Sequence, residues 1–327
     1  MTPLQFEESH QQEWSELQTL LTRLHKSLRG RAADGERIPG ERVAALYRRA
    51  CEQLALARAR AYPAYLTDRL EQLTADGHQL IYQHAELGWS RLQRLVAYDF
   101  PRAVRAHSSY VWIALGVFAI PTLVLGYLVY FRPELILSVV DPTTAASFQN
   151  MYSHDAESIG RARDAQNDWV MFGFYIRNNI GVAFQCFAGG LFAGLGSLFF
   201  LAFNAAYSGA IAGYLTQKGL GDTFYSFVVT HAAFELTAIV LSGAAGLRLG
   251  HALLAPGRFT RQQALVRAAK ESAVIIYGVM ALLLVAAAIE AFWSSARWIP
   301  APMKYGVAAI CWIAVISYLT LQGRSAR

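Results

Sequence analysis

Cysteine is scarce in this sequence of 327 residues, which contains only Cys51, Cys186 and Cys311. Cys51 lies in a polar region and the other two lie in apolar segments, so the sequence predicts no disulfide framework and no cysteine-bound metal. A nucleotide-binding loop, a Ser-His-Asp arrangement and an HExxH helix are also missing. We therefore expect a protein that is not an enzyme and that uses no cofactor and no metal.

Charge is sparse as well, because charged residues make up 16% of the chain whereas hydrophobic residues make up 54%. The charges gather in the first third and in short loops, a split that predicts a membrane protein with a polar extramembrane region. The net charge of +6 is spread over amphipathic segments and loops, and no basic run is interleaved with aromatic residues. This pattern predicts the lipid bilayer as a partner and argues against nucleic acid.

An apolar leader segment is absent from the opening residues, MTPLQFEESHQQEW, so we expect no cleavable signal peptide. Residues 1–108 predict a cytoplasmic helical bundle of four amphipathic helices with a juxtamembrane helix. Breaks are expected at residues 29–40, at Pro63 and near Gly77, with the fourth helix over residues 80–96. The first helix carries one apolar stripe, formed by Phe6, Trp14, Leu17, Leu20, Leu21, Leu24 and Leu28.

The juxtamembrane segment DFPRAVRAH, residues 99–107, predicts an interfacial turn. Its apolar residues Phe100 and Val104 are expected to lie on lipid. Arg102 and Arg105 are expected to meet lipid head groups.

Residues 109–327 predict a transmembrane domain whose first span covers residues 111–131. Residues 132–173 return to polar composition and predict an extracytoplasmic helical insert. The loop at residues 251–271 is rich in arginine and lysine, so the positive-inside rule places it in the cytoplasm. Two further spans are expected at residues 273–292 and 305–321. The prediction is a multi-pass protein of the bacterial cytoplasmic (inner) membrane with a cytoplasmic N-terminus.

The apolar centre, residues 174–249, must cross the membrane an odd number of times to join these two sides. One solution has three crossings, at residues 180–203, at a short span beginning with Asn204, and at residues 224–249. The other has one long helix over residues 180–215 and a re-entrant pair of half-helices over 224–249. We favour the first solution, because 26 residues suffice for one helix. The predicted fold class is therefore all-α, a polytopic membrane bundle of five to six spans with a re-entrant alternative.

Several motifs occur in a fixed order: FPRAVR, FYIRNNI, GGLFAGLG, NAAYSG and HAAFELTAIVLSGAAG. Over residues 95–321 this order resembles the stage II sporulation protein M family, an integral membrane family. The resemblance implies a membrane scaffold, because the namesake recruits cell-wall hydrolases to the engulfing septum. It also implies envelope proteins or a MoxR-type ATPase system as partners. The chain has Ala205 and Ala232 where the family commonly has glycine, and both changes favour continuous helices.

His231 and Glu235 are the sharpest functional candidates in the apolar centre. They are four residues apart, so they share one helix face and can form a hydrogen bond. One interpretation is a proton, ion or ligand site, and the other is a buried polar clasp between two helices. Glu290 ranks below Glu235, because it lies near the outer end of its span.

The other polar candidates have simpler structural interpretations. Asn178 and Asn179 are expected to cap the second span, with Arg177 as an interfacial anchor. The alternative is an anion site at that helix N-terminus. Asn204 forms a polar cluster with Tyr207 and Ser208, which is expected to make an interhelical hydrogen bond rather than a site.

Glycine is frequent in the centre and forms three GxxxG pairs, which favour close helix packing. The pairs are Gly190 with Gly194, Gly209 with Gly213, and Gly246 with Gly250. They suit packing within the chain and a homo-oligomer, most simply a dimer, equally well. The sequence as a whole predicts an envelope scaffold or assembly factor. The alternative is a transporter or channel that uses the buried polar residues.

Overall fold

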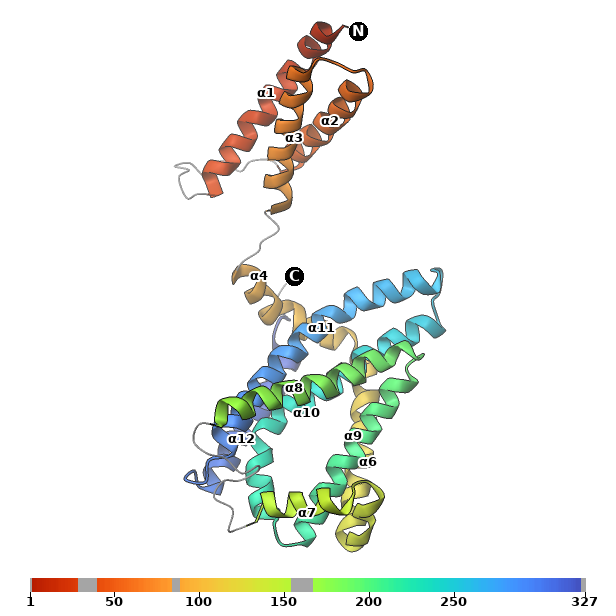
Figure 1. Ribbon diagram of the computed structural model, residues 1–327, viewed down its shortest axis with the longest axis vertical. Helices are drawn as coiled ribbons and strands as arrows, with labels where there is room; N and C mark the ends of the chain where they lie inside the picture. Colours follow the sequence, from red (N-terminus) through yellow and green to blue (C-terminus); the bar gives the residue numbers. More distant parts are fainter. Residues whose placement is uncertain (1, 29–39, 84–88, 154–166, 325–327) are drawn as a thin grey trace. The chain divides into compact units, whose positions relative to one another are not determined.

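The computed structural model describes residues 2–28, 40–83, 89–153 and 167–324, and these ranges contain helices and no strand. The chain divides into two compact units, Met1–Leu92 and Gln93–Arg327. They are called unit 1 and the membrane unit below (Figure 1). The boundary lies earlier than the expected one at residues 108 and 109, because the juxtamembrane segment packs with the membrane helices. The all-α class predicted from the sequence is confirmed.

Unit 1 is a bundle of three long helices, α1 (Pro3–Leu28), α2 (Gly40–Ala59) and α3 (Ala64–Gln83). Each helix turns one apolar stripe inward, as spacings of three and four residues require. Trp14 and Phe6 are the largest apolar side chains of this core, each 1% exposed. The other buried members are Leu17, Leu21, Val43, Leu46, Ala50, Ala57, Leu66, Leu70 and Leu73.

The predicted break near Gly77 is wrong, because α3 continues through it to Gln83. Gly77 is instead a contact position, where an added Cβ would lie 2.8 Å from the ring of Tyr47. Of the predicted fourth helix over residues 80–96, residues 80–83 belong to α3 and residues 89–94 form α4 (Trp89–Arg94). The linker at residues 29–39 and residues 84–88 of that predicted helix lie outside the described residues.

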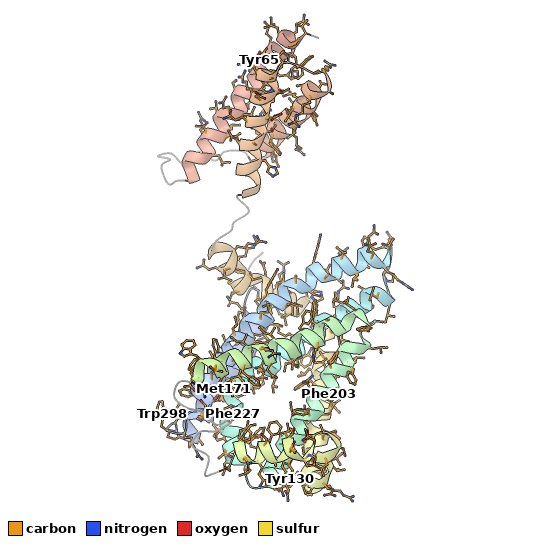
Figure 2. The ribbon with its side chains drawn as sticks, viewed as in Figure 1. Tyr65, Tyr130, Met171, Phe203, Phe227 and Trp298 are labelled. Carbon is orange, nitrogen blue, oxygen red and sulfur yellow. The ribbon has the colours of Figure 1, made fainter. Side chains whose placement is uncertain are left out.

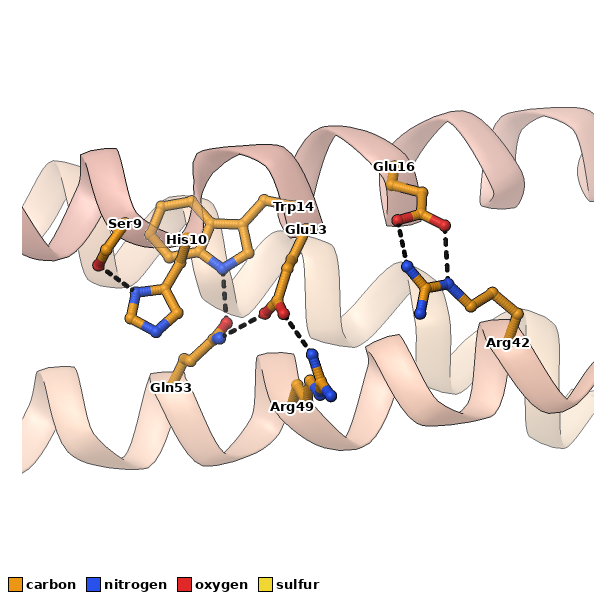
Figure 3. Close-up of polar contacts among 8 residues, drawn as sticks. All are labelled: Ser9, His10, Glu13, Trp14, Glu16, Arg42, Arg49 and Gln53. Atoms are coloured by element: carbon orange, nitrogen blue, oxygen red, sulfur yellow. Dashed lines mark hydrogen bonds and ion pairs between the residues drawn. The ribbon is translucent and has the colours of Figure 1, made fainter.

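A chain of polar contacts joins α1 to α2 beside the core (Figure 3). The indole Nε1 of Trp14 donates to Oε1 of Gln53 at 2.6 Å, and Gln53 Nε2 donates to Glu13 Oε2 at 2.9 Å. Arg49 pairs with the same carboxylate, and Arg42 makes a two-pronged pair with Glu16. Burial raises the pKa of Glu13, but the hydrogen bonds from Gln53 and Arg49 outweigh burial and lower the pKa.

Among the described residues of the membrane unit, five helices are long and apolar enough to cross a membrane. They are α6 (Ser108–Phe131), α9 (Leu195–Gln217), α10 (Gly221–Leu254), α11 (Arg261–Ile289) with the π-helical turn η4 (Glu290–Ser294), and α12 (Ala301–Leu321). Figure 2 labels Tyr130 of α6 and Phe203 of α9 among their large exposed side chains, and Trp298 in the connection between η4 and α12 is exposed as well. An apolar exterior of this kind is what a helix in lipid requires.

The juxtamembrane segment does not lie on lipid as predicted. It forms the π-helical turn η1 (Leu95–Asp99) and the short helix α5 (Phe100–Ala106). Phe100 and Val104 are 3% and 6% exposed, and both belong to a core shared with α8, α10 and α11. Arg105 donates to the carbonyl oxygen of Leu319 at 2.8 Å, so it binds the end of α12 rather than only head groups. Arg102 is exposed.

The centre of the chain folds with different boundaries from both predicted solutions. The helix α8 (Asp168–Ala188) leads through the turn η3 (Gly189–Leu191) into α9, and α10 is one unbroken helix. A long helix over residues 180–215 and a re-entrant pair over 224–249 are therefore wrong. Asn204 does not begin a span either, because it lies inside α9. Ala205 and Ala232 lie inside continuous helices, as predicted.

The helices α8 and α10 run in the same direction. Ser242 Oγ donates to the carbonyl oxygen of Ala183 at 2.5 Å, and further along both helices Gly246 meets Gly190. The helix α9, which joins them in the sequence, runs back in the opposite direction (Figure 1). The helices α8, α9 and α10 thus alternate in direction between the insert and the loop after α10.

The predicted GxxxG glycines all meet other parts of the same chain. A Cβ on Gly190 would lie 2.7 Å from Cα of Gly246, and one on Gly250 would lie 2.6 Å from the carbonyl carbon of Ala193. Gly190 and Gly194 do not share a helix, because Gly190 lies in the turn η3 whereas Gly194 precedes α9 and has a φ of +86°. On α9, Gly209 and Gly213 pack against Thr122 and Gly126 of α6. Packing within the chain therefore accounts for all six.

The insert contains the turn η2 (Pro133–Ser138) and the helix α7 (Pro142–Met151). Asp141 caps α7 by accepting a hydrogen bond from the backbone N–H of Thr144 at 2.9 Å. Ile136, Val140 and Ala145 pack on the ends of α9 and α10. Residues 154–166, also predicted as part of this insert, lie outside the described residues.

Candidate functional site in the membrane unit

His231 and Glu235 form a close pair on one face of α10. Nε2 of His231 lies 3.8 Å from Oε2 of Glu235, as side chains four residues apart on a helix allow. The ring of Phe227 packs edge-on against the imidazole, with the ring centroids 5.3 Å apart. His231 is 4% exposed, whereas the Glu235 side chain is 21% exposed. The pair is therefore largely enclosed but remains accessible on the Glu235 side.

Glu290 brings a second carboxylate to this pair from a distant part of the chain. It is the first residue of η4, where α11 widens into a π-helical turn that packs against α8 and α10. One ligand atom from each of His231, Glu235 and Glu290 lies within 4.8 Å of the others. Glu290 thus belongs with the pair, although the sequence ranked it below Glu235. Single π-helical turns inside α-helices are frequent at functional sites.

Ser294 and Lys304 surround the histidine on its other side. Nδ1 of His231 lies 3.0 Å from Oγ of Ser294, so one hydrogen bond joins α10 to η4. Nζ of Lys304 donates to the carbonyl oxygen of Ser294 at 2.7 Å. Ser294 is 0% exposed and Lys304 is 1% exposed. These contacts fix the imidazole orientation and tie the connection between α11 and α12 to α10.

Asn179 approaches the same region from α8. It is 3% exposed, and its Oδ1 accepts a hydrogen bond from Asn178 Nδ2 at 3.0 Å. Within the described part of the chain, its Nδ2 has no hydrogen-bond partner. Tyr175, one turn earlier, packs on α11, and Ala183, one turn later, packs on α10. Asn179 therefore lies on the α8 face that covers the ends of α10 and α11 bearing the cluster.

The predicted helix cap at Arg177, Asn178 and Asn179 is wrong. The helix α8 begins at Asp168, so these three residues lie in its interior, where backbone N–H groups are already bonded within the helix. The anion site suggested for a helix N-terminus at this point is excluded for the same reason. Arg177 and Asn178 are exposed, and only Asn179 is buried.

Asn204 also differs from its predicted role. Its Nδ2 donates to the carbonyl oxygen of Phe200 at 2.7 Å, a bond within α9 rather than between helices. The contact between α6 and α9 is made by another residue, because Thr122 Oγ1 donates to the carbonyl oxygen of Ala205 at 3.2 Å. The structure therefore brings together His231 and Glu235 of the predicted polar core, with Asn179 on the helix that covers them.

Sequence reasoning missed Ser294 and Lys304 as members of this site, and it ranked Glu290 below Glu235. Their separation from His231 along the chain exceeds 50 residues, and the local pattern of α11 shows only an apolar span. The available signal was a carboxylate within that apolar span, because ionisable groups in membrane helices face a bundle interior or a cavity.

The cluster offers the donor set of a cation site, one imidazole and two carboxylates. The serine hydrogen-bonded to His231, Ser294, is 0% exposed, so its hydroxyl is closed to a substrate. Imidazole nitrogen and carboxylate oxygen are ligands for zinc and other first-row divalent metals.

Comparison with known proteins assigns the two units separately. A family model described as Stage II sporulation protein M matches residues 109–295, which include His231, Glu235 and Glu290. A second, described as a domain of unknown function (DUF8413), matches residues 4–83 and so covers α1 to α3. No curated protein and no solved structure matches the chain.

Proposed function

Because the chain belongs to the stage II sporulation protein M family, we propose that it is a membrane scaffold or assembly factor that positions envelope proteins. The observation that carries the proposal is its division into a membrane unit and a separate helical unit 1 with its own family match. Unit 1 buries an apolar core of its own, and its described residues contain no group of His, Cys, Asp and Glu side chains placed to hold a metal ion. A separately folded unit of this kind suits a docking role.

The partners proposed for unit 1 are envelope proteins or a MoxR-type ATPase system. Its exposed apolar side chains offer sites for a test, because Leu4 is 64% exposed and Tyr65 is 55% exposed. A photo-crosslinking amino acid at either position should capture the same partner in cells. The matched control is Gln12, a polar exposed position of α1.

Deletion of residues 2–92 should abolish partner recruitment while the membrane unit still inserts. Retention of the crosslinked partner by the truncated chain, detected through a tag at the C-terminus, would contradict the scaffold proposal. Equal crosslinking from Gln12 and Tyr65 would argue for random collision instead. A homodimer remains a prediction, now without support from the glycine pairs, since these are buried within the chain.

We propose six crossings in the cytoplasmic membrane, with both unit 1 and the α10–α11 connection on the cytoplasmic side. The sixth crossing is α8, whose 21 residues extend about 30 Å as a helix. The basic residues Arg258 and Arg261 support a cytoplasmic position for that connection.

Cysteine labelling in a chain without its native cysteines tests this topology. A cysteine replacing Lys218, which is exposed between α9 and α10, should react with an impermeant reagent from outside. A cysteine replacing Arg258 should react only after permeabilisation. The reverse pattern would mean that α8 does not cross.

The second candidate function is transport of an ion or small solute, favoured by the buried cluster of His231, Glu235 and Glu290. Under this alternative, Glu235→Gln impairs flux in proteoliposomes without loss of assembly. Equal flux by wild-type protein and by empty vesicles across monovalent and divalent cations would remove it.

A further inference from the structure

We propose that His231, Glu235 and Glu290 bind one divalent transition-metal ion of the zinc class within the membrane unit. The ion would link α10 to η4, two elements that the sequence separates widely. This inference does not depend on whether the protein acts as a scaffold or as a transporter, because a resident metal suits either.

The separation of the side chains is close to that of metal ligands. Nε2 of His231 and Oε2 of Glu235 are 3.8 Å apart, and the third ligand atom, on Glu290, keeps the group within 4.8 Å. Two ligands at about 2.1 Å from a tetrahedral zinc ion are about 3.4 Å apart. Small rotations of the two flexible carboxylates would close the remaining difference, since His231 alone is held rigidly.

The imidazole is oriented for this role by its second nitrogen. A proton on Nδ1 is within hydrogen-bond distance of Ser294 Oγ, at 3.0 Å, and this tautomer leaves the Nε2 lone pair directed toward Glu235. Metal-binding histidines almost always use their other nitrogen in such a bond. Ser294 is itself held in place, because Lys304 binds its carbonyl oxygen. The histidine therefore has the supporting contact that a metal ligand needs.

Asn179 supplies an independent observation. Its Nδ2 is a buried donor without a partner in the described residues, and it lies on the α8 face that packs against both α10 and α11. A zinc ion with three protein ligands keeps a fourth position for water. A water or hydroxide there would offer an acceptor on the side of the cluster that α8 covers, and a buried donor without a partner is otherwise costly.

A second histidine–glutamate pair in the membrane unit shows why proximity alone is not enough. Nε2 of His107 lies 3.9 Å from Oε2 of Glu271, but Arg248 and Arg267 bind that carboxylate at 2.8 and 3.0 Å. No third histidine, cysteine or carboxylate of the described residues joins this pair. The two pairs have nearly equal spacing, so the His107–Glu271 pair is a matched control.

The experiment uses the full chain in detergent, purified through a tag without histidine and stripped of metal with a chelator. Zn²⁺ is added at increasing concentration, and bound metal is measured by elemental analysis after gel filtration. We expect saturable binding of one ion per chain. Co²⁺ in place of Zn²⁺ should give the intense visible absorption of a low-symmetry nitrogen and oxygen site.

Glu290→Gln and His231→Ala should each weaken Zn²⁺ binding by more than about 100-fold, because each removes a ligand, whereas loss of a supporting contact costs 10- to 100-fold. Ser294→Ala should fall in that lower range. Glu271→Gln should leave the affinity unchanged. Glu290→Cys should shift preference from Mn²⁺ toward Cd²⁺, because thiolate favours soft metals.

Absence of saturable Zn²⁺, Co²⁺ and Mn²⁺ binding by the wild-type protein would overturn the proposal without reference to any variant. Binding that survives in the folded Glu290→Gln protein, or that disappears equally in Glu271→Gln, would also overturn it. A variant that does not give a single gel-filtration peak is misfolded and is set aside. The Cd²⁺ preference of Glu290→Cys and the wild-type Co²⁺ spectrum then decide whether the three residues bind the metal.

Discussion

Replacing Gly246 with alanine tests whether the C-terminal end of α8 is held against α10 by direct backbone contact. An added Cβ would lie 2.5 Å from the carbonyl oxygen of Cys186 and 2.8 Å from that of Phe187. These atoms belong to the backbone and cannot rotate away, so the upper end of the overpacking range, about 3 kcal/mol, applies. The substitution also presses on Ser197 Oγ and its hydrogen bond to Cys186, worth about 1 kcal/mol.

Helix propensity acts in the opposite direction, since alanine is favoured over glycine by about 1 kcal/mol inside a helix. The expected net loss is therefore about 3 kcal/mol in the free energy of unfolding. For a unit of this size that corresponds to a melting temperature lower by about 6–12 °C. The assay is thermal unfolding of the detergent-solubilised full chain, followed by the fraction that remains monodisperse.

Gly181→Ala is the matched control, because Gly181 lies inside α8 and an added Cβ there meets nothing within 4 Å. Propensity alone should leave this variant equal to the wild type or stabilise it by up to about 1 kcal/mol. If Gly246→Ala melts at the same temperature as Gly181→Ala, the close contact inferred at Gly246 is refuted.

Two further predictions concern polar contacts. Because the pKa of Glu13 is lowered in the folded protein, its carboxylate contributes stability that is present above about pH 4.5 and lost as the pH falls through the folded pKa. The measurement is hydrogen exchange of the α1 backbone amides, corrected for the pH dependence of the intrinsic exchange rates. On acidification, the wild-type protein should lose more protection in α1 than the Glu13→Gln variant does. Arg105→Ala should cost about 1.5–3 kcal/mol by removing the charged donor to Leu319, whereas exposed Arg102→Ala should be nearly neutral in the same thermal assay.

The sequence pattern predicted a helix correctly where the helix's own periodicity decides its structure. The stripe from Phe6 to Leu28 predicted α1, and the apolar run over residues 111–131 predicted most of α6. The break at Gly189–Leu191 was not predicted, because its glycines were assigned to continuous helices. In the structure they allow the turn to approach Gly246, a contact that depends on a helix distant in the sequence.

Asn178 and Asn179 show a different limit. Asparagine before an apolar run predicts a helix cap. The same sequence also occurs where two asparagines lie in the interior of a helix that begins earlier. The decision between the two depends on whether the preceding residues continue the helix. Here they do, because Tyr175 finds a buried position against α11. Tertiary packing therefore moved the start of α8 back to Asp168.

The position of α10 explains how the polar cluster is tolerated in an apolar unit. This helix packs against α6, α8, α9, α11 and α12, so most of its surface is covered by protein rather than lipid. Ionisable groups in a membrane are least costly on such an interior helix, where partners from neighbouring helices can reach them. Glu290 can join His231 and Glu235 only because η4 is held beside α10 through Ser294. A shift of α11 at this point would therefore separate the Glu290 carboxylate from the His231–Glu235 pair before it disturbed the apolar contacts at the other end of α10.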